Sequence, residues 1–401
     1  MKIASAWSVQ PDECLAATEA YEMLLEKLQG VPHFIFLHSS CSYDNRELIK
    51  RLRALAPEVP LQGGTSCRGV MTESGFHGQD SKGMGLLGVF DPDGNYGAGI
   101  CESRGDPETA TRSALEQALN EASRPGELPV AVVISSYPGH EERVIRAIEK
   151  YLGPGVPIIG GTTADNDMTG QWQQFADDRV LRNAVSIGAL FPSGEVGYGF
   201  HSGYEPTGCR GRATRAEGRV LYEIDNRPAA RVYNEWTEGL ISDILPGGGS
   251  LVPLVSLRPL GRPVGQVGSI SYFRLSYPVE ALADEALKVF TEIKEGDEVF
   301  LMKGTHENLV NRAGRVAEEA VEASPFKADE IQGALVLFCT GCMLIVQDSI
   351  SEVVSGLQSG LNRAPFLGAF TLGEQGCFIG GENRHGNLMI AVLVFGPFKT
   401  D

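Results

Sequence analysis

The sequence predicts an α/β protein with repeated β-α-β units, added antiparallel hairpins, mixed sheets and a chain divided into two halves. Two observations lead to this prediction. The phrase VPLQGGTSC at residues 59–67 returns as VPIIGGTTA at residues 156–164, and a looser version, APFLGAFTLGE, occupies residues 364–374. Each phrase follows a short apolar run and a stretch with helical periodicity, so the repeat is a structural unit and not a loop alone.

The first unit begins with the apolar run HFIFLHSSC at residues 33–41, which ends in two serines. The next stretch places Leu48, Leu52 and Leu55 on one face at helical spacing. The Gly-Gly phrase then supplies a second strand and a turn. In such a β-α-β unit the two strands run parallel, so the Ser-Ser turn and the Gly-Gly turn should lie at the same edge of the sheet.

The second unit repeats this order. PVAVVISSY at residues 129–137 is the strand, and Val144, Ile148, Tyr151 and Leu152 mark the helix face. The second serine precedes the valine of the Val-Pro pair by 19 residues in the first copy (40 to 59) and by 20 in the second (136 to 156). The near-equal spacing predicts that the two units superpose.

The third unit is more diverged. GALVLFCTG at residues 333–341 is the strand, and Val354, Leu357 and Leu361 share one helix face. Ala369 stands where the first two units have their second glycine. We expect the same β-α-β order here with a different turn.

Turn residues separate further strands and helices. Residues 84–100 show a strand-like alternation of residue types on both sides of an Asp-Gly pair. Residues 183–200 show the same around a Ser-Gly pair, and the two patterns predict two β-hairpins. Residues 106–123 read as a helix with Asp106 or Thr109 as its N-cap.

Composition excludes several classes of protein. The 401 residues carry 34 basic and 51 acidic side chains, a net charge of -17, and no basic stripe, which argues against nucleic acid or an anionic membrane as partner. No apolar run approaches the roughly 20 residues that span a bilayer, and the first residues do not read as a signal peptide. The eight cysteines are irregularly spaced, unlike a secreted disulfide scaffold. We therefore expect a cytoplasmic protein.

Several phrases of the second half occur in the order typical of one known family. They are Asn-x-Pro-Ala and Val-Tyr at residues 226–233, Glu-Gly-Asp and Leu-Met at residues 295–302, the strand that ends at Cys339, and the glycine phrase at residues 368–374. This order resembles the C-terminal half of the FIST family, and the two Gly-Gly units resemble its N-terminal half. The resemblance predicts a FIST N-terminal domain at residues 1–217 and a FIST C-terminal domain at residues 218–401.

The resemblance implies a sensory role. FIST proteins are regarded as cytoplasmic ligand-binding modules of bacterial signalling, for which amino acids were proposed as ligands. They occur with histidine kinases, methyl-accepting proteins and cyclic-di-nucleotide enzymes. The match takes up nearly the whole chain, so the expected output partner is a separate protein, such as a histidine kinase or a cyclic-di-nucleotide enzyme. One branch resembles haem-binding nitric-oxide sensors, which leaves haem open as a cofactor; His385 is the first candidate for its axial ligand, with His38 and His140 behind it.

The chain departs from the family after Cys339. The family usually continues with small polar residues and Arg-Gly, whereas this chain reads CTGCML, with Cys342 and Met343 at those positions. The resulting Cys-x-x-Cys, with Cys377 as a third cysteine, suits a metal or a redox pair, and equally two small half-buried residues.

An enzyme is the rival interpretation. The sequence GMGLLG at residues 83–88 matches the G-x-G-x-x-G pattern of dinucleotide-binding loops. A hairpin signal follows it, however, where such a loop is followed by a helix. Cys67, beside Arg68, could act as the nucleophile of a small-molecule hydrolase or transferase with His38 or His77 as base. No recognisable catalytic motif supports this alternative.

We place the site at the carboxyl ends of the predicted strands, mainly in the third unit. There residues 370–376 would face residues 339–342 near His385, with Glu374 taking an ammonium group and Thr340 a carboxylate. The candidate ligand-binding residues are Ser39, Ser40, Gly63, Gly64, Thr65, Ser135, Ser136, Gly160, Gly161, Thr162, Cys339, Thr340, Cys342, Phe370, Thr371, Glu374 and His385. The candidate metal or haem ligands are His385, Cys339, Cys342 and Cys377.

Overall fold

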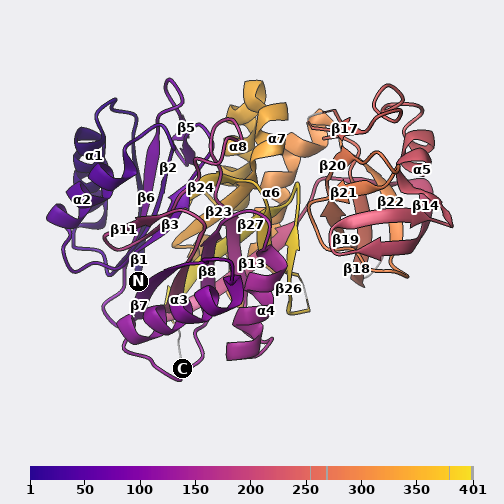
Figure 1. The fold of residues 1–401 in the computed structure, drawn as a ribbon. Coiled ribbons are helices and arrows are strands. Elements are labelled where there is room, and N and C mark those ends of the chain that lie inside the picture. Colours follow the sequence, from indigo (N-terminus) through magenta and orange to yellow (C-terminus); the bar gives the residue numbers. More distant parts are fainter. Residues whose placement is uncertain (253, 268–269, 379, 399–401) are drawn as a thin grey trace.

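The computed structural model describes residues 1–252, 254–267, 270–378 and 380–398 (Figure 1). The predicted mixed α/β fold is confirmed: the described residues form three six-stranded mixed sheets and a fourth sheet of nine strands. No helix among them is long and apolar enough to cross a membrane.

The three six-stranded sheets belong to three copies of one unit. Unit 1 contains β1 (Lys2–Ser8), α1 (Glu13–Leu28), β2 (Phe34–Ser39), α2 (Asn45–Leu55), β3 (Leu61–Thr65), β4 (Val70–Thr72), β5 (Gly75–His77) and β6 (Met84–Phe90). Unit 2 contains β7 (Asn95–Glu102), α3 (Pro107–Glu121), β8 (Ala131–Ser136), α4 (Glu141–Leu152), β9 (Ile158–Thr162), β10 (Gln174–Ala176), β11 (Arg179–Leu181) and β12 (Ala184–Phe191).

Unit 3 follows the same order but is interrupted. It contains β13 (Gly194–His201), α6 (His306–Glu322), β23 (Gly333–Cys339), α7 (Thr340–Ile345), α8 (Ile350–Gly360), β24 (Phe366–Thr371), β25 (Glu374–Phe378), β26 (Glu382–Gly386) and β27 (Ile390–Phe398). Between β13 and α6 lies the inserted sheet: β14 (Glu205–Glu217), β15 (Val220–Ile224), β16 (Arg227–Pro228), α5 (Ala229–Trp236), β17 (Gly249–Ser250), β18 (Leu260–Val267), β19 (Ile270–Ser276), β20 (Pro278–Ala281), β21 (Leu287–Val289) and β22 (Glu298–Lys303). Figure 1 shows this sheet, coloured pink to orange, to one side of the three units.

The units exchange hairpins in a closed cycle. In each unit the two strands of the β-α-β motif pair in parallel: β2 with β3, β8 with β9, and β23 with β24. The strand after each Gly-Gly phrase then leaves its own unit. β10 of unit 2 pairs with β3 of unit 1, β25 of unit 3 pairs with β9 of unit 2, and β4 of unit 1 pairs with β24 of unit 3. The three units therefore form one interlocked body.

The two predicted hairpins at residues 84–100 and 183–200 are wrong. β6 pairs with β1 and β2, whereas β7 pairs with β12 in another sheet. Likewise β12 pairs with β7 and β8, whereas β13 pairs with β27. A Gly-containing turn reverses the chain locally, but burial decides the strand partners. β6 is buried along nearly its whole length, so it needs a neighbour on each side, and the Asp-Gly turn is a corner between two sheets.

Helices cover the outer face of each sheet, and the inner faces share one core. α1 and α2 pack on the sheet of unit 1, α3 and α4 on that of unit 2, and α6 and α8 on that of unit 3 (Figure 1). Phe36 of β2 lies 6.3 Å from Phe395 of β27, ring to ring, in the shared core. The predicted helix at residues 106–123 is α3, and Asp106 caps it by accepting from the backbone N–H groups of Glu108 and Thr109.

The predicted superposition holds after a shift of one residue in the Ser-Ser turns. Ser39 pairs with Thr65, and Ser136 pairs with Thr162. The structural equivalent of Ser39 is therefore Ser136, the second serine of its pair. In both units the strand ends at the same edge as its Gly-Gly phrase, as predicted.

The repeated Gly-Gly phrase joins the three units in a ring. The amide of Ala164 donates to the carbonyl of Thr65 (3.1 Å), that of Leu372 to Thr162 (2.9 Å), and that of Cys67 to Phe370 (3.2 Å). The three donors occupy the same position of their units, as do the three acceptors. Each unit therefore binds the next through the same hydrogen bond.

The second glycine of each phrase is required by the neighbouring unit. A Cβ atom on Gly64 would lie 2.3 Å from Cγ2 of Thr163, and one on Gly161 would lie 2.4 Å from Cγ2 of Thr371. At the third junction the facing residue is Ser66, whose hydroxyl accepts from the amide of Phe370 (2.8 Å) and which has no methyl group. Ala369 replaces the glycine there because serine leaves room for a Cβ atom.

Candidate functional site

The ring opens into a cavity of about 620 Å³ between the three units and the inserted sheet. Unit 1 contributes Cys67, unit 2 contributes residues 165–168, and unit 3 contributes residues 339–341, Leu344, Ile345, Leu372, Asn387 and Leu388. The inserted sheet adds Val252, Leu254, Ser256, Leu257, Tyr277 and Phe290. We call this space the apolar cavity, because most of these side chains are apolar. Its volume is in the range of small-molecule sites.

Large apolar side chains of this cavity are open to water. Leu254 is 48% exposed and Met168 50%, while Val252 and Leu344 are each more than one third exposed. The four come from three separate segments of the chain yet line one space. A contiguous apolar surface of this kind is typical of a binding site.

One buried hydroxyl group on the cavity wall has only a weak partner. Thr340 is 5% exposed, and its Oγ1 has no nitrogen or oxygen partner among the described residues. The thiol of Cys67 is the polar group that interacts with it. Because buried polar groups normally make hydrogen bonds, this hydroxyl is available to a ligand.

Further polar groups of the cavity are held in place by the backbone. Asp165 accepts from the amides of Met168, Gly170 and Gln171 at 2.7–2.8 Å, which closes the loop that carries Asp167. Asn387 accepts from the amide of Tyr277 (3.1 Å) through Oδ1, which leaves its amide nitrogen as the donor. The loop and Asn387 are therefore fixed before any ligand arrives.

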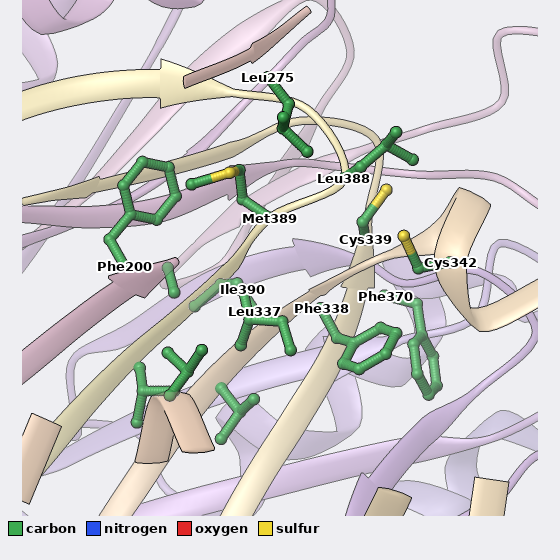
Figure 2. Close-up of a cluster of buried hydrophobic side chains, with 14 of the residues drawn as sticks. Phe200, Leu275, Leu337, Phe338, Cys339, Cys342, Phe370, Leu388, Met389 and Ile390 are labelled. Atoms are coloured by element: carbon green, nitrogen blue, oxygen red, sulfur yellow. The ribbon is translucent and has the colours of Figure 1, made fainter. Parts of the chain in front are cut away.

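Beneath the cavity lies a pair of cysteines at the start of α7. Cys339 ends β23 and lines the cavity, whereas Cys342 is fully buried one turn later. Figure 2 shows the two side chains next to each other, above Phe338 and Phe370 in this view. Burial opposes ionisation of Cys342, but the hydrogen bond from Cys339 and the charge of Arg312 outweigh it and lower the pKa of the Cys342 thiol to about 6.

A second cavity, of about 510 Å³, lies where the inserted sheet meets α4 and β26. We call it the charged cavity, since Glu142, Arg146, Arg262, Arg274 and Asp297 are among its lining residues. Most of these charges are paired: Arg146 with Glu292 at 2.7 Å and Arg262 with Asp297 at 2.9 Å.

Arg219 of the inserted sheet anchors this region. Its guanidinium contacts Glu141 at 2.6 Å and also Glu142, which in turn lies 3.2 Å from Nδ1 of His385. Burial opposes ionisation of Glu142, but His385 and Arg219 outweigh it and hold the pKa of this carboxyl well below its usual range. Glu141, Glu142 and His385 are close enough to share a metal ion. The guanidinium already supplies the positive charge there, so we assign no metal.

The structure places the predicted site residues in several different environments. Cys339 and Thr340 line the apolar cavity. Phe370, Thr371 and Glu374 are buried below it; burial raises the pKa of Glu374 well above its usual range, and its oxygens accept from Thr371 Oγ1 (2.8 Å) and the amide of Met389 (3.1 Å). The residues buried in and around the ring are Ser39, Ser40, Gly63, Gly64, Thr65, Ser135, Ser136, Gly160, Gly161 and Thr162.

The histidines considered for haem lie apart from the apolar cavity. His385 lines the charged cavity, and His38 is buried with Nδ1 3.0 Å from the carbonyl of Gly64. His140 precedes α4 and packs on Tyr137. Among the described residues that line the apolar cavity there is no histidine.

The remaining cysteines do not extend the pair at α7. Burial raises the pKa of the Cys67 thiol to about 12, which opposes its use as a nucleophile. His77, its suggested base, instead hydrogen-bonds Thr72 at 2.8 Å. Cys377 lies on β25 with its sulfur 3.7 Å from the carbonyl of Phe378, and the described residues place it in no metal-ligating group with Cys339 and Cys342.

Sequence reasoning missed two segments of the apolar cavity. Residues 165–168 directly follow the second Gly-Gly phrase, so the repeat itself pointed to them. Val252 and residues 254–257 follow three glycines within the inserted sheet. The apolar stretch after this glycine loop was the signal available in the sequence. The segments that it faces across the cavity lie far away in the sequence, so it could not be assigned to the site.

Comparisons with known proteins agree with the sequence resemblance. The model of the FIST N domain matches residues 33–227, and that of the FIST C domain matches residues 229–377. An uncharacterised protein of Methanocaldococcus jannaschii is 27% identical over 179 residues, which are 43% of this chain and 33% of that protein. An uncharacterised protein of Mycobacterium bovis is 27% identical over 245 residues, 58% of this chain and 59% of its own length. The chain thus spans less than two thirds of these curated relatives.

Solved structures give a weaker likeness. A cyanuric acid hydrolase from A. caulinodans aligns over 99% of both chains with 11% identity and a TM-score of 0.34. Phosphoribosylformylglycinamidine synthase II of Thermotoga maritima aligns with a TM-score of 0.23 over 98% of this chain and 71% of its own, at 10% identity. Scores this low carry no argument about fold or activity. The two domain matches together cover most of the sequence, and the chain belongs to the FIST family.

Proposed function

We propose that this protein is a sensor whose apolar cavity binds a small amino-acid-like molecule. FIST domains are associated with signalling, which gives the coarse functional class. The observation that supports ligand binding is the cavity itself, a space of about 620 Å³ with exposed apolar walls and an available buried hydroxyl group. Family membership and the cavity together favour binding over catalysis.

The lining favours a ligand with an apolar body. Val252, Leu254 and Leu344 would pack on an aliphatic side chain, and their burial would contribute about 25 cal/mol per Å² of apolar surface. Leucine is a suitable probe, since its side chain is aliphatic and its backbone groups are charged.

The polar ends of the cavity fit the two charges of an amino acid. Both oxygens of Asp165 accept from backbone amides, so Asp167, which also lines the cavity, is the carboxylate for an ammonium group. Thr340 Oγ1 and the amide nitrogen of Asn387 are donors for a carboxylate. Among the described lining residues there is no Lys, Arg or His, so the amino group should contribute more to binding than the carboxylate.

We further propose that the sensor acts on a separate output protein. We propose a histidine kinase or a cyclic-di-nucleotide enzyme, whose activity in a reconstituted assay should change on adding this protein with leucine but not with leucine alone. An unchanged activity over the concentration range that saturates leucine binding would reject these partners.

Calorimetry with three matched ligands tests the binding mode. We expect leucine to bind, 3-methylbutylamine, which lacks the carboxylate, to bind within about tenfold of it, and 4-methylpentanoate, which lacks the amine, to bind at least tenfold more weakly than leucine; a factor of ten equals about 1.4 kcal/mol. Equal binding of the acid and the amine would contradict the role of Asp167. No heat from any of the three would reject an aliphatic amino acid as ligand.

Matched variants locate the site. Leu254→Glu should abolish leucine binding because it places a charge in the apolar wall, whereas Leu128→Glu, at a leucine 64% exposed outside both cavities, should not. Asp167→Asn should weaken the binding of leucine. Asp178→Asn, which changes an exposed aspartate elsewhere, should leave the affinity for leucine unchanged. Equal losses in a variant and its control would point to a general effect on folding.

A further inference from the structure

The interior of unit 3 holds a positive charge with no carboxylate partner. Arg312 of α6 is 1% exposed, and Nη1 donates to the carbonyl of Leu388 at 2.6 Å. Its Nε and Nη2 atoms have no nitrogen or oxygen partner. Among the described residues, Arg312 forms no ion pair with Asp or Glu. The guanidinium lies 5.0 Å from the centre of the Phe338 ring. An isolated buried charge is costly, so a counter-ion is expected nearby.

Cys342 is the group that can supply the negative charge. Its sulfur lies 3.6 Å from the hydroxyl of Tyr204 and interacts with Arg312 and with the thiol of Cys339. Glu374 also faces Arg312, but burial raises the pKa of its carboxyl well above its usual range and so opposes its charged form. A Cys342 thiolate therefore balances Arg312, while Cys339 keeps its proton and donates it to that thiolate.

The geometry of the pair suits a disulfide. The two cysteines stand three residues apart, Cys339 as the N-cap of α7 and Cys342 in its first turn, and the Cys339 thiol hydrogen-bonds the Cys342 sulfur. Gly341 between them is so close that a Cβ atom there would lie 3.7 Å from the Cys339 sulfur. In Figure 2 the two side chains lie next to each other. Cys339 opens onto the apolar cavity, which gives a small reagent access.

We propose that Cys339 and Cys342 form a reversible thiol–disulfide pair, which small neutral organic disulfides oxidise from the apolar cavity. This proposal uses the same cavity as the sensor but does not depend on leucine binding. In units 1 and 2 the turn after the equivalent strand contains no Cys-x-x-Cys. The cysteine pair is therefore specific to unit 3.

The oxidation is a two-step thiol–disulfide exchange. Cys339 passes its proton to the Cys342 thiolate while its sulfur attacks one sulfur of the reagent RSSR. The S–S bond of RSSR breaks, and the leaving thiolate takes the proton from Cys342 and departs as RSH. The Cys342 thiolate then attacks the Cys339 sulfur and expels RS⁻. The two cysteines lose two electrons in total, and RSSR gains them as RSH and RS⁻.

The cavity decides which oxidant is favoured. Asp165 and Asp167 are its charged lining residues, so an anionic disulfide such as oxidised glutathione is repelled. Bis(2-hydroxyethyl) disulfide is small and neutral and is the probe of choice. We expect it to oxidise the pair at least tenfold faster than oxidised glutathione at equal concentration.

Mass spectrometry of a tryptic digest tests the proposal. Residues 328–363 form one tryptic peptide, which contains Cys339 and Cys342 and no other cysteine. After treatment of the reduced protein with bis(2-hydroxyethyl) disulfide, and alkylation of free thiols, this peptide should be two hydrogen atoms lighter than the reduced form and carry no alkyl group. A peptide that stays alkylated at both cysteines while the peptides of Cys14 or Cys209 acquire adducts would overturn the proposal.

The role of Arg312 is tested by rate and by pH. Arg312→Met should slow formation of the disulfide at least tenfold, and Arg315→Met, a control on the same helix, should leave the rate unchanged. If Arg312→Met does not fold, the wild-type rate decides: it should be constant from about pH 7 to 8.5, because the thiolate is already formed. A rate that rises tenfold per pH unit across this range is that of an ordinary thiol and would contradict the proposal. Leucine binding is measured by calorimetry and not by disulfide formation. Either proposal can therefore be rejected while the other still holds.

Discussion

The inserted sheet meets the three-unit core at two hollows of similar size and opposite character. The charged cavity is bounded by ion pairs, such as Arg146 with Glu292 and Arg262 with Asp297, although Nε of Arg262, Nε of Arg274 and Nε2 of His385 have no hydrogen-bond partner among the described residues. The apolar cavity exposes Leu254 and Met168 to water and leaves a buried threonine hydroxyl with only a weak partner.

We interpret this difference as that between a structural contact and the proposed binding site. Most charges of the charged cavity neutralise each other and hold the sheet against α4, and a few guanidinium and imidazole nitrogen atoms stay without a partner. A ligand that covers apolar walls and accepts a hydrogen bond from an available hydroxyl group is bound favourably. His385, which was selected from the sequence for its chemistry, lies at the charged cavity and not at the apolar one.

The largest expected effect is the loss of the anchor in the charged cavity. Arg219→Met removes the partner of Glu141 and Glu142 and leaves two buried carboxylates close together. We expect the free energy of unfolding to fall by about 3–5 kcal/mol, measured by urea titration. Arg210→Met, which breaks an exposed pair with Glu298, should cost less than about 1 kcal/mol. Similar losses for both variants would show that the buried pair is not special.

The next effect concerns the core beneath both hollows. Gly161→Ala places a Cβ atom 2.4 Å from Cγ2 of Thr371 and should cost about 1–3 kcal/mol by overpacking. Adding Thr371→Ser reproduces the alanine–serine combination of the third junction. We expect the double variant to recover at least about 0.5 kcal/mol in a double-mutant cycle by urea titration. Simple additivity would contradict the explanation of the Gly-Gly phrase.

Acid should weaken the charged cavity selectively. The folded-state pKa of Glu142 is depressed, so its contribution to stability is present above about pH 4.5 and is lost as the pH falls below that value. One such carboxyl changes the free energy of unfolding by up to about 1.4 kcal/mol per pH unit. Between pH 5 and pH 3, thermal unfolding of Glu142→Gln should therefore shift less than that of the wild type. The exposed control Glu116→Gln should follow the wild type, and identical curves for all three would reject the assignment.

The smallest effect on stability is expected at the apolar cavity. Thr340→Val keeps the side-chain shape and removes a hydroxyl group that has no nitrogen or oxygen partner among the described residues. The free energy of unfolding should change by less than about 0.5 kcal/mol. The affinity for leucine should fall about tenfold, because the ligand loses one hydrogen bond; calorimetry measures this. A large loss of stability with unchanged affinity would reverse the roles assigned to the two hollows.

The sequence was sufficient to predict the repeated unit, because strand, helix and turn signals are local. The parallel pairing of β2 with β3 and of β8 with β9 followed from the β-α-β order. The exchange of hairpins between units was not predictable in this way. The turn at Asp91 to Gly94 looks like a hairpin, and only the burial of β6 on both sides shows that it joins two sheets.

The site was predicted only in part for a similar reason. Cys339 and Thr340 were found because they end a strand of the repeat. Glu374 and His385 were chosen for their chemistry, but their partners, Thr371 and Glu142, use that chemistry inside the fold. The wall formed by Leu254 comes from the inserted sheet, whose position against the ring depends on contacts between distant segments.

Hydrogen exchange with and without leucine tests the distinction between the two hollows most directly. At saturating leucine we predict slower exchange of backbone amides in residues 254–257 and 340–345, with no change in residues 142–149 and 382–385. Slower exchange confined to the charged cavity, with none at the apolar cavity, would contradict the account.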